Sequence, residues 1–585
     1  MGEEYTRSLI PAQIINIQNP VANLAEPVVF ALHRSGDELV YNVNRSNSWS
    51  QVDASWNIDL NAMTDVLDRA LYLRMDVQVD FAGTAPVGQN LLQTGYDAFR
   101  AFPLQAIMED LRITINGTSW NQNQRKYVPY LQRICGFDNI LEYSMSMAPH
   151  YLDAAQTYDQ LVNTNRNPLG GYAEAPTGGE TARGGFPMRV LSNTNTSASV
   201  IATITEPLMI TPLVWADMMK KGLSGINRVT IDITWAASMA SRVWSHSNAS
   251  GSVFTSAPAV TLGQPQLLTR VVRPQKVYMN RVPRQLLYEY NQLRIYPTST
   301  NNSLAAGATD EVTMNNIQLS TVPDTVILFL RKRDQDLTYL DTDTFAAIQS
   351  VNILWGTKTG ILAGASPQDL YQIARRNGVA LSWESWSGET ISTMLGSTTS
   401  TLAGVGGILP LKVGADIPVD ADESAGVSKR TQVTITIRYK NVSPNPINFD
   451  AFAVMLDKGT WSVMDGMSAY QVGVVSARAA QEAPDVNPTF TYQTASALHE
   501  GGNFFGDLWG GLKKIGNFVG DEVIPMASKI VGPAIGVYKT ITGRGFEPED
   551  DNMSVRSMSS VGSAQSMTGG KLVPHNTLKK RLGRI

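Results

Sequence analysis

The stretch from Val322 to Trp386 decides the fold, and it reads VPDTVILFLRKRDQDLTYLDTDTFAAIQSVNILWGTKTGILAGASPQDLYQIARRNGVALSWESW. Its first apolar run, residues 326–330, is short, begins with β-branched residues and ends at three consecutive basic residues. Such a run predicts a strand that is buried on both faces. A second strand is predicted over residues 351–355, where a glycine follows the apolar run.

One short helix is predicted inside the same stretch. Ser366 is a suitable N-cap, Pro367 occupies the first helical position, and Asn377-Gly378 supplies the stop signal. Two strands and a single capped helix thus lie inside a β-rich context.

Strict alternation of apolar and polar residues marks further strands along the chain. It occurs over residues 71–81, 229–235 and 432–441, and it predicts strands with one face on a core and one face in water. Residues 452–466 are expected to form a closing pair of strands.

Several of these motifs, in this order, resemble the major capsid proteins of polinton-like viruses and virophages, within the double jelly-roll lineage that includes adenovirus hexon. The motifs are the strand ending at Arg331, VNILWGTKTGIL (351–362) and DLYQIARRNGVALSW (369–383). The segments 206–215 and 225–227 are also similar to the end of that family's first barrel. The resemblance covers about residues 50–470. It implies a mainly β chain with two consecutive jelly-roll barrels, short helices between strands and a helical C-terminal tail.

Changes in composition and pattern divide the chain into six segments. They are an N-terminal arm (1–50), a first jelly roll (51–270) with a long loop excursion near 155–200, a second jelly roll (271–478) that is expected to begin with a linker near residues 274–300, a linker (479–502), a Gly-rich amphipathic helical segment (503–543) and a flexible Ser-rich tail with a basic end (544–585).

Composition excludes several classes of protein. The formal net charge of the 585 residues is only −4, so the chain as a whole has no electrostatic attraction to nucleic acid or to anionic membranes. Cys135 is the only cysteine, which excludes an intrachain disulfide scaffold. The N-terminal residues contain no apolar signal-peptide core, and no stretch reaches the roughly 18 apolar residues of a spanning helix. The resemblance to capsid proteins implies a location in the virion, and together with these observations it implies assembly inside the host cell rather than secretion through a signal peptide.

No catalytic, cofactor or metal site is expected. The five histidines are scattered, so we expect them on the surface or in loops rather than around a metal. One acidic loop has the wrong spacing for an EF-hand and is expected to be solvated; it contains Asp334, Asp336, Asp341 and Asp343. No Gly-x-Ser-x-Gly nucleophile motif occurs in the sequence.

The C-terminal region carries an apolar face at helical spacing. Its residues are Phe504, Phe505, Leu508, Trp509, Leu512, Ile515, Phe518 and Val519. Such a Gly-rich, Trp-bearing helix fits an interfacial peptide that acts on the host membrane through residues 503–520. It equally fits an internal scaffold helix that docks on the shell.

Two further features lie in the tail. Met567-Thr568-Gly569-Gly570 followed by Lys571 resembles the cleavage pattern of adenovirus-type maturation proteases, which implies a viral protease as a partner. The last residues are basic and could contact the packaged genome through its phosphates; they are Lys571, Lys579, Lys580, Arg581 and Arg584.

Two functions are compatible with these observations. The first is a major capsid protein that trimerises into pseudo-hexagonal capsomers and self-assembles into the icosahedral shell of a non-enveloped DNA virus, beside penton or minor capsid proteins. The second is a virion attachment or carbohydrate-binding β-protein, whose Asn- and Thr-rich loops bind a host surface. An enzyme is not expected.

Overall fold

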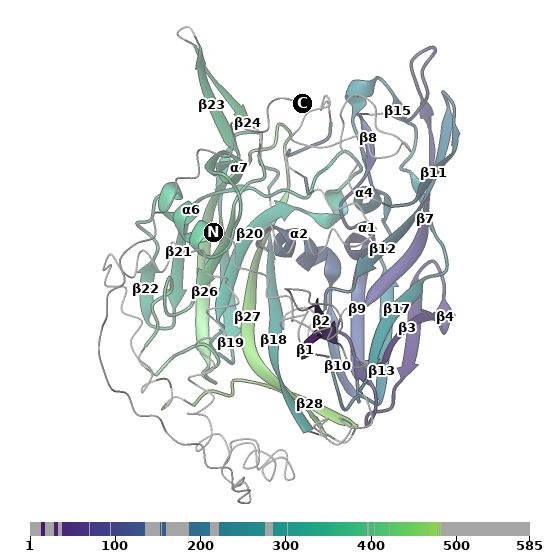
Figure 1. Ribbon diagram of the computed structural model, residues 1–585. Coiled ribbons are helices and arrows are strands. Elements are labelled where there is room, and N and C mark those ends of the chain that lie inside the picture. The colour runs from purple at the N-terminus through teal and green to yellow at the C-terminus, as the bar shows by residue number, and fades with distance from the viewer. Residues whose placement is uncertain are drawn as a thin grey trace, which may run out of the picture.

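The computed structural model describes residues 13–17, 28–32, 38–134, 152–159, 186–210, 222–274 and 285–480, apart from a few single residues and one pair inside these ranges. There the chain forms two β-units side by side (Figure 1). The first unit runs from β3 (Glu38–Arg45) to β17 (Gln266–Arg273), and the second from β18 (Gln285–Ser299) to β28 (Met467–Val472).

The first unit contains two main antiparallel sheets. One has the order β10-β9-β13-β5-β4 and the other β11-β12-β7-β17-β3, with β15 and β16 paired to β7 and β6 paired to β17. The remaining bounds are β4 Ser48–Trp49, β5 Asp53–Asp59, β6 Val66–Leu67, β7 Tyr72–Thr84, β8 Asp97–Phe99, β9 Met108–Ile115, β10 Thr118–Gln122, β11 Met188–Asn193, β12 Ser197–Pro207, β13 Arg228–Trp235, β14 Trp244–His246, β15 Val253–Phe254 and β16 Ala259–Leu262. Its helical segments are α1 Pro103–Ile107, α2 Gln124–Ile134, α4 Ala240–Val243 and η1 Asn248–Ser250.

The second unit also contains two main antiparallel sheets. One has the order β18-β27-β20-β25, with β28 paired to β27, and the other β19-β26-β21-β22. The bounds are β19 Thr309–Leu319, β20 Thr325–Lys332, β21 Ala347–Trp355, β22 Lys358–Ile361, β25 Ile408–Lys412, β26 Thr431–Lys440 and β27 Phe449–Met464. The short helices are η2 Asp334–Asp336, α6 Pro367–Arg376 and α7 Trp383–Ser387, and the hairpin β23 (Glu389–Met394) and β24 (Ser397–Leu402) projects beyond the unit (Figure 1).

Each unit has its own hydrophobic core, formed by the inward faces of its sheets. The predicted alternation is confirmed along β7, β13 and β26, where buried residues alternate with more exposed ones. The prediction of a strand buried on both faces is also confirmed, because β20 is buried from Thr325 to Arg331. Helix α2 of the first unit lies against this strand, which explains why neither face of β20 meets water.

The predicted helix is confirmed together with its cap. The side chain of Ser366 accepts a hydrogen bond from the backbone N–H of Asp369 at 3.3 Å, and the Asp369 carboxylate accepts one from the backbone N–H of Ser366 at 2.9 Å. This reciprocal capping box satisfies two helix-terminal donors, and Pro367 begins the helix as expected.

Several segments differ from their expected descriptions. Residues 38–49 were assigned to an irregular arm, but they form β3 and β4, and β3 pairs with β17. Residues 285–299, expected as part of a linker, form the long strand β18. Residues 188–193, assigned to the loop excursion, form β11, and residues 452–464 belong to one long strand, β27, rather than to a pair. β3 was missed because its apolar residues face outward at a sheet edge, where the sequence gives no core signal.

Candidate functional site at the junction of the two β-units

The two β-units are joined at two places by residues that come from both of them. We call these the ionic anchor (Arg100, Arg242, Arg331, Asp334 and Asp343) and the aromatic anchor (Trp120, Tyr288, Trp461 and Tyr470). The ionic anchor lies beside α4 and η2, and the aromatic anchor lies where β28 reaches across to the first unit (Figure 1).

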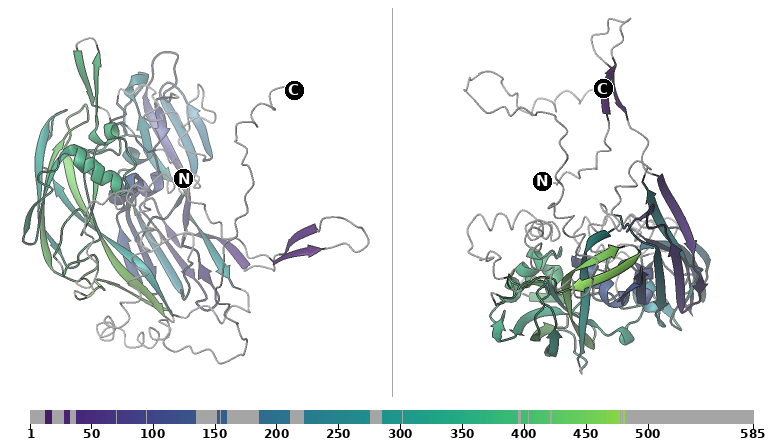
Figure 2. Two further views of the ribbon diagram at one scale, coloured as in Figure 1. Left: turned by 60° about the vertical axis from the view of Figure 1, so that its left-hand side comes forward. Right: turned by 90° about the horizontal axis from the view of Figure 1, so that it is seen from below.

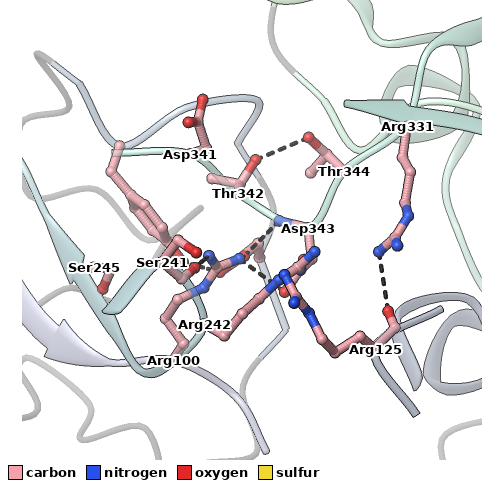
Figure 3. A network of polar contacts seen from close by, with 12 residues as sticks. Arg100, Arg125, Ser241, Arg242, Ser245, Arg331, Asp341, Thr342, Asp343 and Thr344 are labelled. Atoms are coloured by element: carbon pink, nitrogen blue, oxygen red, sulfur yellow. Dashed lines mark hydrogen bonds and ion pairs between the residues drawn. The ribbon is translucent and has the colours of Figure 1, made fainter. Parts of the chain in front are cut away.

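Asp343 is the centre of the ionic anchor (Figure 3). Arg100 follows β8 in the first unit, and its Nη2 lies 2.7 Å from Oδ2 of Asp343 in the second. Arg242 of α4 forms an ion pair with the other oxygen, Oδ1. The backbone N–H of Asp343 donates to the Asp153 carboxylate at 2.9 Å, so Asp343 is held through both its side chain and its backbone.

Asp334 of η2 extends the same network. Nη2 of Arg242 lies 2.6 Å from Oδ1 of Asp334, so Arg242 joins both aspartates of the second unit. Nη2 of Arg331 contacts both oxygens of Asp334, at 2.9 and 3.0 Å. Nη1 of Arg331 donates to the backbone carbonyl of Arg125 in α2 at 3.0 Å, which is a second bond between the units.

The ionic anchor is charged at neutral pH. The side chains of Arg100 and Arg242 are both 1% exposed, whereas Asp343 is 22% exposed. Burial alone would raise the pKa of Asp343, but the charges of Arg100 and Arg242 outweigh it and hold that pKa at about 2. Burial lowers the pKa of Arg242 to about 10, which still leaves it charged. The buried guanidinium of Arg242 therefore depends on carboxylates of the other unit for its neutralisation, whereas Arg100 also pairs with Asp153 of its own unit at 3.2 Å.

The aromatic anchor centres on Trp461 of β27, which is fully buried. Its ring stacks on Tyr288 of β18, with centroids 5.1 Å apart, and meets Trp120 of β10 edge-on at 5.3 Å. Beside it, the hydroxyl of Thr118 in β10 donates to the carbonyl of Ser468 in β28 at 2.6 Å. The anchor thus combines apolar burial with hydrogen bonds between strands of the two units.

The units exchange core residues at this junction. Tyr288, Trp461 and Val463 come from the second unit but belong to the hydrophobic core of the first. In return, Tyr127 and Tyr130 of α2 belong to the core of the second unit, where the ring of Tyr130 lies 4.9 Å from that of Phe329. Each core is therefore completed by the other unit, so the relative position of the two units is fixed by packing.

Two expectations about polar residues are wrong at this junction. The acidic loop is not simply solvated, because Asp334 and Asp343 form the ionic anchor and Asp341 pairs with Lys332 at 2.8 Å. His246 is not a surface residue: it is fully buried, its Nδ1 lies 2.8 Å from the Asp97 carboxylate, and its Nε2 lies 3.1 Å from the Ser252 carbonyl. Both errors arise because the decisive partners, Arg242 for Asp334 and Asp343 and Asp97 for His246, are more than 90 residues away in sequence.

The junction is suited to holding two bodies in one geometry, because each core is completed by residues of the other unit. Within the described ranges, no group of three or more His, Cys, Asp or Glu side chains could hold a metal ion. Over the same residues, no helix is both long enough and apolar enough to cross a membrane.

Comparisons with known proteins show similarity to virophage capsid proteins along most of the chain. The family described as "Sputnik virophage major capsid protein 1st domain" matches residues 12–280, and "Major capsid protein V20 C-terminal domain" matches residues 293–459. Capsid protein V20 of Sputnik virophage is 28% identical over 564 residues, which cover 92% of this chain and 93% of the relative. This chain is a homologue of the virophage major capsid proteins.

Solved structures agree with this assignment. A chain in the cryo-EM structure of Sputnik virophage is 27% identical, with a TM-score of 0.71, and the match covers 84% of this chain and 99% of that one. The mavirus major capsid protein has the same fold, with a TM-score of 0.65 at 13% identity over 81% of this chain and 99% of that one. The virophage capsid homologue described here is thus a structural component of the virion, and its relatives are structural proteins rather than enzymes.

The candidate residues named from the sequence lie outside the described ranges of this capsid protein. This applies to the apolar face within residues 504–519, to the cleavage pattern at 569–571 and to the basic residues at 579–584. Sequence reasoning missed both anchors. The tryptophans and arginines of the anchors are ordinary in composition, and only their placement in three dimensions reveals what they join.

Proposed function

We propose that this protein forms the shell of a non-enveloped icosahedral DNA virus as a double jelly roll that trimerises into pseudo-hexagonal capsomers. The exchange of core residues supports this most directly, because a subunit that tiles a shell needs its two units in one fixed geometry. Two joined β-units give each chain two similar bodies, so three chains supply six around a capsomer axis.

Oligomeric state tests this proposal. We expect an obligate trimer, with interfaces on the order of 2,000 Å² or more, so light scattering of the full chain should give three times the monomer mass at micromolar concentration. Negative-stain electron microscopy should then show hexagonal capsomers or closed shells. A stable monomer at that concentration would contradict the proposal, and isolated spikes would favour the attachment or carbohydrate-binding protein instead.

We also propose that residues 503–520 act on a host membrane during infection, with internal scaffolding of the shell as the competing role. Leaving the apolar face in water costs roughly 1.5–3 kcal/mol for each large side chain, so the face must be covered in the particle. A synthetic peptide of residues 503–520 should become helical on lipid vesicles and release an entrapped dye. Trp509→Ser combined with Phe505→Ser should abolish release and leave capsomer assembly unchanged; loss of shells without any lipid binding would identify a scaffold.

The tail carries two further proposals. A viral protease is expected to cut between Gly570 and Lys571, and Gly569→Val should block the cut; a virion-derived chain that always ends at Ile585 would contradict this. The basic residues after the cut would contact the genome through phosphates, so a peptide of residues 571–585 should bind DNA less tightly as salt concentration rises. Penton and minor capsid proteins are the remaining expected partners.

A further inference from the structure

In addition to the two anchors, the β-units meet at a buried histidine. The two units lie side by side in both views of Figure 2, and a segment of the second unit, residues 337–341, crosses to the first. The backbone N–H of His246 in β14 donates to the carbonyl of Tyr339 at 3.1 Å, and that of Tyr158 donates to the carbonyl of Leu340 at 2.8 Å. The Tyr339 ring packs against the first core, 5.2 Å from the ring of Phe254 in β15.

We call this contact the upper clasp (Tyr158, His246 and Phe254 of the first unit, Tyr339 and Leu340 of the second). β14 pairs with β8, and β8 and β15 lie at the upper end of the first unit in Figure 1, whereas β28 and the aromatic anchor lie at the lower end. The upper clasp is therefore a separate point of attachment between the units.

Both ring nitrogens of His246 face hydrogen-bond acceptors. Nδ1 lies 2.8 Å from Oδ1 of Asp97, and Nε2 lies 3.1 Å from the carbonyl oxygen of Ser252. The Asp97 carboxylate also accepts from the indole N–H of Trp244 at 3.2 Å and from the backbone N–H of Gln93 at 2.9 Å. A neutral imidazole has one N–H and can satisfy only one of its two neighbours. The contacts of His246 therefore fit the doubly protonated, positively charged ring.

Burial makes this proton important. The side chains of His246, Asp97 and Ser252 are all 0% exposed, so a lost N–H leaves an acceptor that water does not reach. Burial alone would lower the pKa of His246, but the Asp97 carboxylate outweighs it and raises that pKa above the ordinary 6.5. The other charge acting on the ring is Asp159, which also favours the protonated form.

The remaining neighbours of the His246 ring do not titrate in the same range. Phe254 stacks on it at 4.1 Å and carries no charge. The Tyr339 ring lies 6.1 Å away, and burial raises the pKa of its phenol above the ordinary value of about 10. Asp341 of the same segment is paired with Lys332 at 2.8 Å. A change of charge near neutral pH in the upper clasp is therefore a change at His246.

We propose that the proton on His246 keeps the upper clasp closed, and that the clasp opens more often once this proton is lost. Tyr339 and Phe254 cover the ring, so lifting residues 337–341 lets water reach it and removes the advantage of the charged form. Because the folded pKa is raised above 6.5, the clasp is most stable below that pH and weakens as pH rises through the folded pKa. The inference goes beyond the shell function and does not depend on it, because every contact lies within one chain.

Hydrogen exchange resolved by peptide tests the clasp on the full chain. Exchange is followed from about pH 6 to about pH 9 and corrected for the intrinsic effect of pH on exchange. The reporters are the backbone N–H groups of His246 and Tyr158, because each donates across the junction. Their protection should fall by about tenfold per pH unit above 6.5 until the folded pKa of His246 is passed. Protection that stays flat at both reporters over this range would overturn the proposal.

Two internal comparisons separate the clasp from general loosening. The backbone N–H groups of β21 and β26 lie in the second unit away from the clasp and should show no such fall. Glu206 also has a raised pKa, but its carboxylate accepts from the backbone N–H groups of Leu104 and Gln105 in α1, so its titration is followed in the α1 peptide. An equal fall in β21 and β26 would show general unfolding and would refute a local clasp.

A histidine variant gives the second readout. His246→Gln cannot carry the charge, so at about pH 6 it should already show the low protection that the unaltered chain reaches at about pH 9, with no further fall. The matched control is His150→Gln, which removes another histidine of the chain and should keep the fall. A fall that persists in His246→Gln would contradict the role of this proton. If His246→Gln does not fold, the pH series of the unaltered chain decides alone.

Discussion

Replacing Trp461 with alanine should destabilise the first β-unit, although Trp461 belongs to a strand of the second. Truncating a fully buried Trp costs about 3–5 kcal/mol from lost burial and the cavity left behind. The indole N–H of Trp461 has no hydrogen-bond partner among the described residues, so its removal returns part of that cost. A net loss of about 3 kcal/mol is large beside the 5–15 kcal/mol that stabilises a typical domain.

Hydrogen exchange resolved by peptide can locate this loss. Trp461→Ala should speed exchange in β9 and β10 of the first unit, whereas Trp461→Phe keeps an aromatic ring in the anchor and should change exchange little. The matched control is Trp355→Ala, because Trp355 is equally buried but belongs to the second core. That control should speed exchange in β21 and β26 instead. Faster exchange in the second unit alone after Trp461→Ala would refute the exchange of core residues between units.

Three further predictions concern charged groups. Asp343→Asn removes a negative charge from beside the buried arginines Arg100 and Arg242, so it should lower the free energy of unfolding, measured by urea titration, by about 3 kcal/mol. The control is Asp59→Asn, because Asp59 is exposed and its replacement should change that free energy by less than about 1 kcal/mol. The pKa of Asp343 is lowered to about 2 in the folded protein, against about 3.9 in the unfolded chain. The contribution of Asp343 to folding stability is therefore complete above about pH 3.9 and is lost only as pH falls toward 2. The melting temperature should accordingly show that the ionic anchor persists at about pH 5. Burial alone would lower the pKa of His246, but the Asp97 carboxylate outweighs it and raises that pKa. Burial raises the pKa of Glu206 to about 8, although two backbone N–H groups donate to its carboxylate. The contributions of both groups to folding stability are therefore lost as pH rises through their folded pKa values. Melting temperature should fall as pH rises from about 4.5, the ordinary pKa of Glu206, toward 8, and less steeply in His246→Gln or Glu206→Gln.

The sequence predicted what depends on local pattern. Alternation located β7, β13 and β26, and the signals at Ser366 and Pro367 located α6, because these depend on neighbours within one strand or one helical turn. It failed where a residue's role depends on distant partners. Arg242 and Asp343 are 101 positions apart, and nothing near either residue in sequence indicates that they meet.

The edge strand β3 shows a second limit of pattern reasoning. Its alternation is as regular as that of β7, but its more hydrophobic face is turned to solvent. The same periodicity therefore does not identify core residues in β3. The long strand β18 was expected to be part of a linker because its residues contact two different cores. Tyr288 near its start lies in the first core, whereas Leu293 and Ile295 pack against the second. A strand that is shared between two cores has no single inward face to recognise in sequence.

Because the two β-units exchange core residues, their shared surfaces matter more than the peptide link for holding them together. Trp461 and Tyr288 enter one core while Tyr130 enters the other, so the units hold each other as a tightly matched heterodimer would. A chain cut between Pro274 and Gln285 should therefore yield two fragments that co-purify when expressed together. Each fragment produced alone would expose the hydrophobic socket of its absent partner and would aggregate. The protein thus has two covalently tethered halves that hold each other by shared packing, and circular permutation at that link should be tolerated.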